Sequence, residues 1–186
     1  MMISRVMDRK VEVMVTTTIA LDQDTGTDTE SVVERYQKMV YAIAVTHTRS
    51  RGDADDVFQE VFLTYHRKQP TCGDEEYRKA WLITTTLNIS RRFMGSSWST
   101  RVVPMDDSDE RAEIFRFDID EYDGLLKALT SLPENYRSVI HLFYFEDLSI
   151  AQISTVLDVE PGAVKMRLSR GRVMLRVAMK KEDSHD

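Results

Sequence analysis

The stretch from Ser149 to Lys181 limits the possible folds of this chain more than any other segment. It is predicted to form a short amphipathic helix, a tight turn at residues 158–160 and a second helix. Ser149 followed by Gln152 is a capping-box pattern, and Pro161 suits the first helical position, where no backbone N–H is needed. Gly171 costs about 1 kcal/mol relative to alanine inside a helix, which indicates a close helix contact. The residues at helical spacing that are predicted to face inward are Ile150, Ile153, Val156 and Leu157, then Val164, Leu168, Gly171 and Leu175.

The second helix of this pair is strongly basic although the whole chain is acidic. Its charged residues are all Lys or Arg until Glu182, whereas the 186 residues have a formal net charge of −6. Phosphates attract such a local cluster of cations, so the helix is typical of a surface that contacts nucleic acid. The alternative is a solvated amphipathic helix at the end of a bundle. The residues expected to point outward are Gly162, Ala163, Lys165, Met166, Ser169 and Arg170. Three further cations are expected to lie near phosphates or neighbouring acids: Arg167, Arg172 and Arg176.

Further helices are predicted in the rest of the chain, where apolar residues recur at helical spacing. In the first half they cover residues 31–47, about 53–67 and about 74–93. We expect Asp53 to cap the second of these helices. Leucines from residue 125 onward and Pro133, which starts a helix, indicate more helical structure before the helix-turn-helix.

The helix over residues 53–67 has an acidic side opposite its apolar face. Three- and four-residue spacing brings Asp56, Gln59, Glu60 and Leu63 to that side. Carboxylates and an amide beside an exposed leucine suit a partly basic helical partner. The alternative is a solvated face, since the helix dipole by itself favours an Asp near the N-terminus.

The helix over residues 74–93 carries a second stripe that is polar and then basic. We expect Trp81 in this stripe to anchor the core, with stacking on a base as the alternative. An amide next to guanidinium groups suits recognition of a base together with backbone phosphates. In the loop that follows, Trp98 and Arg101 are expected to help hold a base. The other residues of the stripe are Thr84, Thr85, Asn88, Arg91 and Arg92.

Three segments resemble the extracytoplasmic-function branch of the sigma-70 family. Residues 53–67 (DADDVFQEVFLTYHR) are similar to region 2.2 of that family, and residues 81–98 (WLITTTLNISRRFMGSSW) to its regions 2.3 and 2.4. Residues 131–149 (SLPENYRSVIHLFYFEDLS), with the basic helix after them, resemble region 4, the promoter-recognition domain. The segments stand in the order of the family, and the resemblance extends over residues 31–179.

The resemblance implies an all-α chain with two small helical domains joined by an acidic linker. Region 2 would cover residues 31–98, the linker residues 99–123, and the region 4 helix-turn-helix residues 124–181. Residues 1–30 precede the resemblance, and we expect a disordered leader there. A docking strand and a start codon placed too early are the alternatives.

The resemblance also implies a role for each polar surface. The face with Asp56, Gln59, Glu60 and Leu63 would bind the β′ clamp helices of core RNA polymerase, and region 4 would meet the β flap. The outward side of the basic helix would read the −35 promoter element. An anti-sigma factor, commonly membrane-anchored, would regulate the protein. The residues that would hold the melted −10 element, with one base turned out of the stack, are Thr84, Thr85, Asn88, Arg91, Arg92, Trp98 and Arg101.

The sequence departs from the family at positions that would touch DNA. Arg92 stands where the family often has an Asp, and Ala163 and Met166 stand where it often has Thr or Ser. The promoter sequence of other members therefore does not carry over to this chain.

Two other classes of function are alternatives to a sigma factor. The first is a stand-alone helix-turn-helix regulator that binds operator DNA. Its C-terminal segment would be similar, but it would not require the VFQEVF and WLITTTLN segments. An enzyme with a DNA-binding appendage would need a nucleophile, a base or metal ligands in a recognisable pattern. No such pattern occurs, so we expect no catalysis, no metal and no cofactor.

Composition agrees with a protein of the cytoplasm. No apolar run approaches the roughly 20 residues that span a bilayer. Cys72 is the only cysteine, which excludes an internal disulfide and suits a reducing compartment. The hydrophobic fraction of 42% permits real cores, while 30% charged residues favour a well-solvated surface.

Overall fold

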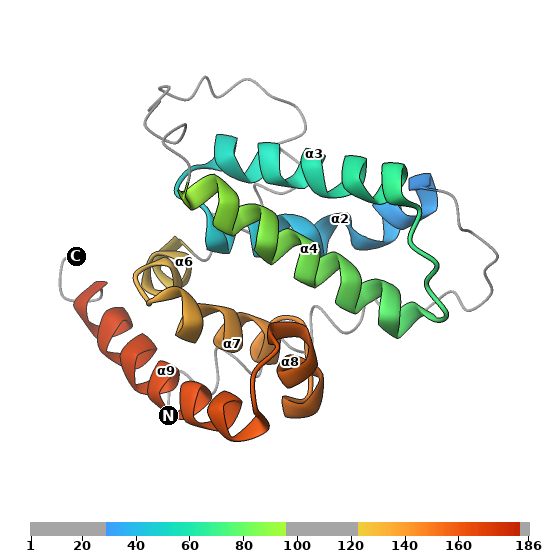
Figure 1. The fold of residues 1–186 in the computed structure, drawn as a ribbon. Coiled ribbons are helices and arrows are strands. Elements are labelled where there is room, and N and C mark those ends of the chain that lie inside the picture. The colour runs from blue at the N-terminus through green and yellow to red at the C-terminus, as the bar shows by residue number, and fades with distance from the viewer. Residues whose placement is uncertain (1–28, 96–122, 183–186) are drawn as a thin grey trace.

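The computed structural model describes residues 29–95 and 123–182 of the chain. Within those two ranges the structure is helical throughout and forms two bundles (Figure 1). The first bundle consists of α2 (Thr29–His47), α3 (Arg51–Lys68) and α4 (Glu75–Gly95). The second consists of α6 (Asp123–Thr130), α7 (Glu134–Tyr144), α8 (Ile150–Leu157) and α9 (Pro161–Glu182). The predicted all-α fold with two helical domains is confirmed, whereas residues 1–28 and most of the acidic linker lie outside the described ranges.

The first bundle is held together by apolar side chains from all three of its helices. Val40 on α2, Val57 and Val61 on α3, and Leu82 on α4 are completely buried. Trp81 packs edge-on against Tyr65, with the ring centroids 5.7 Å apart. Trp81, which is half-buried, therefore packs against the core of this bundle, in agreement with the expected anchor role.

The predicted cap of α3 was wrong. Ser50, with φ of −140°, is the N-cap, and its Oγ accepts a hydrogen bond of 3.1 Å from the backbone N–H of Asp53. The helix therefore begins at Arg51, two residues earlier than expected. Asp53 lies in the first turn instead, where its negative charge is favourable at the positive end of the helix dipole.

The helix-turn-helix of the second bundle follows its sequence pattern closely. Ser149 and Gln152 form the predicted capping box, with side-chain to backbone distances of 3.2 and 2.8 Å. Asp158 ends α8 in the left-handed conformation, with φ of 51°, and α9 starts at Pro161 as predicted. The inward residues of α9 are buried as predicted: Val164, Leu168, Gly171 and Leu175.

The two bundles pack against each other along one seam. Ile43 on α2 and Ile83 and Leu87 on α4 belong to the same apolar cluster as the core of the second bundle. As a result α7 is buried on two sides, by α9 and by α2. Figure 1 shows α3 on the outer side of the first bundle, away from α6–α9. This packing between the bundles was not among the predictions from the sequence.

Candidate nucleic-acid interface

The predicted −35 residues lie on the outward side of the first three turns of α9. Lys165, Met166, Ser169 and Arg170 are exposed, as is Gly162, whereas Ala163 and Arg167 are half-buried. Met166 leaves 45% of its surface in solvent. The helix thus presents cations together with an apolar group, a combination that suits phosphates and the methyl edge of thymine.

Arg172 differs from the other cations of α9. Its Nε donates a hydrogen bond of 2.7 Å to the hydroxyl of Tyr144, and its guanidinium lies 5.6 Å from the ring of Phe143. These contacts fix the guanidinium against the aromatic side chains of α7. Arg172 therefore helps to join α9 to α7, whereas Arg176 remains exposed.

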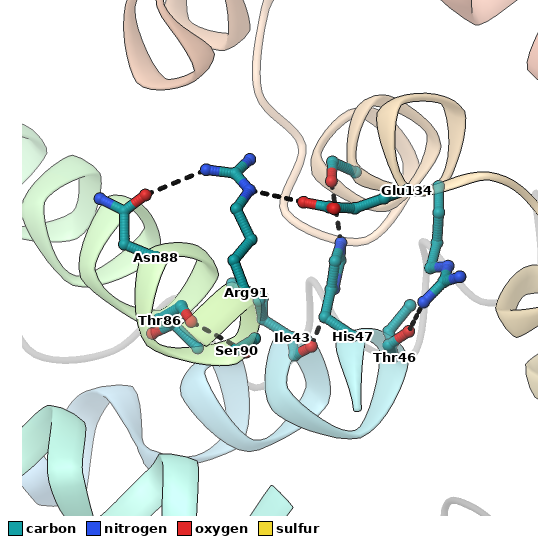
Figure 2. Close-up of polar contacts among 10 residues, drawn as sticks. Ile43, Thr46, His47, Thr86, Asn88, Ser90, Arg91 and Glu134 are labelled. Carbon is teal, nitrogen blue, oxygen red and sulfur yellow. Dashed lines mark hydrogen bonds and ion pairs between the residues drawn. The ribbon is translucent and has the colours of Figure 1, made fainter. Parts of the chain in front are cut away.

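The predicted −10 residues of α4 form an exposed stripe that ends at the seam. Asn88, Arg91 and Arg92 are exposed, while Thr84 and Thr85 are half-buried. Asn88 Oδ1 accepts a hydrogen bond of 3.0 Å from Arg91 Nη1 (Figure 2). The two side chains most suited to a base and a phosphate are thus already next to each other. Trp98 and Arg101 lie outside the residues that the structure describes.

Arg91 also crosses the seam between the bundles. Its Nε lies 2.5 Å from Oε1 of Glu134, at the start of α7 (Figure 2). About half of each side chain is exposed, so solvent screens the pair and it is worth about 1 kcal/mol at most. Its importance is geometric, because it directs the guanidinium toward the second bundle.

A buried histidine lies at the centre of the same seam. His47, 4% exposed, has its Nδ1 2.9 Å from the carbonyl oxygen of Ile43 and its Nε2 2.9 Å from the Oγ of Ser138 on α7 (Figure 2). A carbonyl oxygen can only accept, so neutral His47 carries its proton on Nδ1 and accepts from Ser138 through Nε2. Burial, the ring of His141 and the Arg137 and Arg91 guanidinium groups lower the pKa of His47 to about 3, although the Ile43 bond acts in the opposite direction. The closed seam therefore requires the neutral ring.

Other polar contacts also cross the seam. The guanidinium of Arg137 donates across it to the carbonyl oxygen of Thr46 at 3.1 Å, and within the second bundle to the carbonyl oxygens of Thr130 and Leu132 at 2.9 and 2.8 Å. Two further links are Lys79 Nζ to the carbonyl oxygen of Glu146 at 2.9 Å, and Gln152 Nε2 to Glu76 Oε1 at 2.6 Å.

Sequence reasoning missed these seam residues. The available signal was in α7, where the buried residues Ser138 and His141 interrupt an otherwise apolar run. Polar side chains at buried positions need partners, so this break in the pattern indicates a second contact surface on α7.

The predicted polymerase-binding residues share the outer face of α3. Asp56, Gln59 and Leu63 are exposed, and Leu63 leaves 47% of its surface in solvent. Glu60 is half-buried, with Oε1 3.5 Å from Thr64 Oγ1 and 4.0 Å from Arg67 Nη1. The face thus presents an uncovered leucine between acidic groups, and its role in binding polymerase stays a prediction.

Two other kinds of feature are absent from the described part of the chain, a cluster of metal ligands and a helix able to span a membrane. Over residues 29–95 and 123–182, no three His, Cys, Asp or Glu residues are gathered as metal ligands would be. None of the helices in those ranges combines the length and apolar character needed to cross a bilayer.

Comparison with known proteins identifies both bundles. Residues 32–100 match the family Sigma-70 region 2, and residues 122–175 match Sigma-70, region 4. RNA polymerase sigma factor SigV of Bacillus subtilis is 27% identical over 77% of this chain and 86% of its own length. ECF RNA polymerase sigma factor SigW of the same organism is 25% identical over 83% of this chain and 89% of its own length.

Solved structures share the fold. CnrH, in complex with the cytosolic domain of CnrY, has a TM-score of 0.61 and 21% identity, over 82% of this chain and 88% of that chain. The sigma factor RpoE of Bartonella quintana, in complex with the anti-sigma factor NepR, has a TM-score of 0.60 and 20% identity, over 81% of this chain and 96% of that chain. With regions 2 and 4 in family order and a helix-turn-helix that carries the basic surface, this chain belongs to the extracytoplasmic-function branch of the sigma-70 family of RNA polymerase sigma factors.

Proposed function

We propose that this protein directs core RNA polymerase to promoters through three separate surfaces. The outer face of α3 binds the β′ clamp helices, the α4 stripe holds the melted −10 element, and the start of α9 reads the −35 element. A further contact joins region 4 to the β flap. One observation carries the proposal. Each surface has side chains that are chemically complementary to its proposed partner, and each lies in the sigma region to which the family assigns that partner.

The division of charge supports this assignment. The chain has a net charge of −6, so it repels DNA overall, while α9 carries a basic patch. Binding confined to small patches is weak for a free protein and becomes specific when polymerase holds both patches on one promoter. The protein itself catalyses nothing, and it uses no cofactor.

An anti-sigma factor is the proposed regulator. The fold is shared with CnrH, solved with the cytosolic domain of CnrY, and with RpoE, solved with the anti-sigma factor NepR. We expect the anti-sigma factor of this protein to be membrane-anchored and to bind the protein in the cytoplasm, where it would cover surfaces that polymerase or DNA needs.

Reversing the charge at the centre of the α3 face should weaken binding to core polymerase about tenfold. The Asp56→Arg variant places a cation where we propose a partly basic partner, and Asp56 is exposed, so the helix should remain folded. The measurement is a titration of fluorescently labelled protein with purified core polymerase, together with promoter-specific transcription by the reconstituted enzyme.

The matched control is Glu34→Arg, which makes the same charge change at an exposed position on α2. Equal affinities for Asp56→Arg, Glu34→Arg and the unchanged protein would contradict the proposed α3 interface. Tight, specific binding of duplex DNA by the free protein would instead favour a stand-alone regulator.

Replacing Asn88 with alanine should impair promoter opening more than initial promoter binding. A base can be read by the Asn88 amide only after it leaves the stack, and loss of such a contact costs about 1–3 kcal/mol. Permanganate reactivity of unpaired thymines measures opening, while filter binding to closed promoter at low temperature measures the first step.

The control variant is Asn135→Ala, an amide truncation on α7 outside the proposed DNA stripe. An Asn88→Ala protein with equal losses at both steps, and with a lowered melting temperature, would make Asn88 a structural residue only.

A further inference from the structure

We propose that one side of α9 docks on the surface of an anionic lipid bilayer. This side, the outward ridge, is defined as Met166, Arg170, Val173, Met174 and Val177. The inference goes beyond the proposed function, because the −35 contact uses only the first three turns of α9 and assigns no partner to the rest of the ridge.

The exposed large hydrophobic side chains are concentrated on this helix. Within the described ranges six of them are exposed, and four of the six lie on α9. Arg170, Val173 and Val177 follow Met166 at four- and three-residue spacing, so they share one side of the helix, and Met174 lies next to Val173. The ridge is therefore a continuous stripe. The exposed fractions are 45% for Met166, 56% for Val173, 40% for Met174 and 52% for Val177.

Reading of the −35 element does not account for the C-terminal half of the ridge. A recognition helix contacts base edges with its N-terminal residues. At a rise of about 1.5 Å per residue, Val177 lies about 24 Å along the axis from Pro161, well beyond the first three turns. Val173, Met174 and Val177 are thus free to contact an apolar partner that is not DNA.

The charges of α9 indicate the chemistry of that partner. No Asp or Glu occurs from Pro161 to Lys181, so the partner must be anionic as well as apolar. A second copy of the chain docked through α9 would bring like charges together, which is unfavourable. A bilayer with anionic lipids offers phosphates at its surface and hydrocarbon directly beneath, so it can bind cations and apolar side chains together. The exposed cations of the helix are Lys165, Arg170, Arg176 and Lys180.

The shape of the ridge favours a bilayer over an acidic peptide. Within its own bundle α9 packs against α6, α7 and α8, and Figure 1 shows it along the outer edge of that bundle. An amphipathic peptide buries its apolar side in a groove between elements. The ridge is instead the convex side of one helix, and a fluid lipid surface can close around such a ridge.

The position of the acidic residues allows this orientation of the whole protein. The α3 face, with exposed Asp56, lies on the side of the first bundle that faces away from α6–α9 (Figure 1). Docking through α9 therefore keeps these carboxylates away from an anionic surface, although the net charge of the chain is −6.

Cosedimentation of the full-length protein with lipid vesicles tests the proposal. Vesicles of phosphatidylglycerol and phosphatidylcholine in equal parts should bind the protein more than about tenfold more tightly than phosphatidylcholine alone, because the cations of α9 need an anionic surface. Absence of binding to the anionic vesicles would overturn the proposal.

A double variant separates insertion of the ridge from simple charge attraction. Val173→Ser with Val177→Ser removes apolar surface without changing any charge, and should weaken binding to the anionic vesicles about tenfold. The matched control is Tyr77→Ser, which removes an apolar side chain that is 55% exposed on α4 and should bind as the unchanged protein does. Circular dichroism checks that both variants are folded. Equal binding by the double variant and the unchanged protein would overturn docking through the ridge.

A fluorescent label shows which side of the protein meets the lipid. A nitrobenzoxadiazole label on Val177→Cys should shift to shorter wavelength when anionic vesicles are added, because its surroundings become apolar. The same label on Lys68→Cys, exposed on α3, should not shift, and Cys72 is replaced by serine in both proteins. A shift at position 68 as large as that at position 177 would place another side of the protein at the lipid and overturn the proposal.

A protein as the occupant of the ridge has a different signature. The double valine variant would then lose affinity for purified core polymerase, while the unchanged protein would not sediment with the anionic vesicles. That pair of results would overturn the bilayer and assign the ridge to a polymerase contact.

Discussion

Replacing Gly171 with valine should destabilise the second bundle by about 3 kcal/mol. A Cβ added at this position of α9 would lie 2.9 Å from Cγ1 of Ile140 and 3.3 Å from its Cδ1. Ile140 is completely buried in the core of the second bundle, so its side chain cannot swing out into solvent. The two further methyl groups of valine would enlarge the overlap and push α9 away from α7.

Helix propensity favours the substitution of Gly171, but its contribution to the free energy of unfolding is smaller than the cost of the steric overlap. Removing a glycine from a helix interior gains roughly 0.5–1 kcal/mol, whereas overpacking a filled core costs about 1–3 kcal/mol or more. Alanine at position 171 should therefore be destabilising only mildly, and valine strongly. Denaturant unfolding followed by circular dichroism measures the difference.

The control is Gly162→Ala on the same helix, where an added Cβ meets nothing within 4 Å. It should leave the stability of the bundle nearly unchanged. Truncation of Ile140 to alanine should partly rescue Gly171→Val, because it removes the two nearest atoms and leaves only Tyr136 Cβ, at 3.5 Å, which is an ordinary contact distance. A Gly171→Val protein as stable as the unchanged one would show that the contact of α7 and α9 is not as close as described.

Lowering the pH from about 7.5 to about 5.5 should favour separation of the two bundles. The ratio of open protein, with the bundles apart, to closed protein, with the bundles packed along the seam, should rise about tenfold. His47 must be neutral in the closed seam, where its pKa is lowered from 6.5 to about 3. Once the bundles separate, Nε2 meets water and the pKa returns toward 6.5. Pulsed electron paramagnetic resonance between spin labels on Lys68→Cys in α3 and Val177→Cys in α9, both exposed and with Cys72 replaced by serine, reports the ratio at each pH.

The direction of the effect follows from proton binding. Above pH 6.5 the ring is neutral in both forms, so the closed form is fully stable. Between pH 6.5 and 3 only the open form binds the proton, and each pH unit shifts the balance by about 1.4 kcal/mol toward opening. The charged groups and the titratable ring near His47 are Arg91 on α4 and Arg137 and His141 on α7.

Substitution of His47 by glutamine separates this residue from other titrations. Glutamine can keep a hydrogen bond toward Ser138 but does not titrate, so the distances should become insensitive to pH over this range. The control is needed because a second buried histidine, His141, lies on α7 with its Nε2 3.4 Å from Oε1 of Glu146. A pH response that persists in His47→Gln would assign the effect elsewhere.

The sequence by itself determined the parts of the fold that depend on neighbouring residues. The capping box of Ser149 and Gln152 and the start of α9 at Pro161 need only local hydrogen bonding and a fixed φ angle, so they were predicted correctly. Helical spacing likewise identified the buried side of α9. The cap of α3 was missed by three residues, since Ser50 and Asp53 both favour a cap position and only the path of the chain decides between them.

The sequence also determined which residues are exposed on each helix face, including Asn88 on α4 and Met166 on α9. Only the tertiary structure decided what lies opposite those faces. The bond between Arg91 and Glu134 joins residues 43 positions apart, and that between His47 and Ser138 joins residues 91 positions apart. The spacing of residues within one helix cannot predict how two bundles are oriented relative to each other. That orientation depends on how the apolar surfaces and buried polar groups of the two bundles fit together.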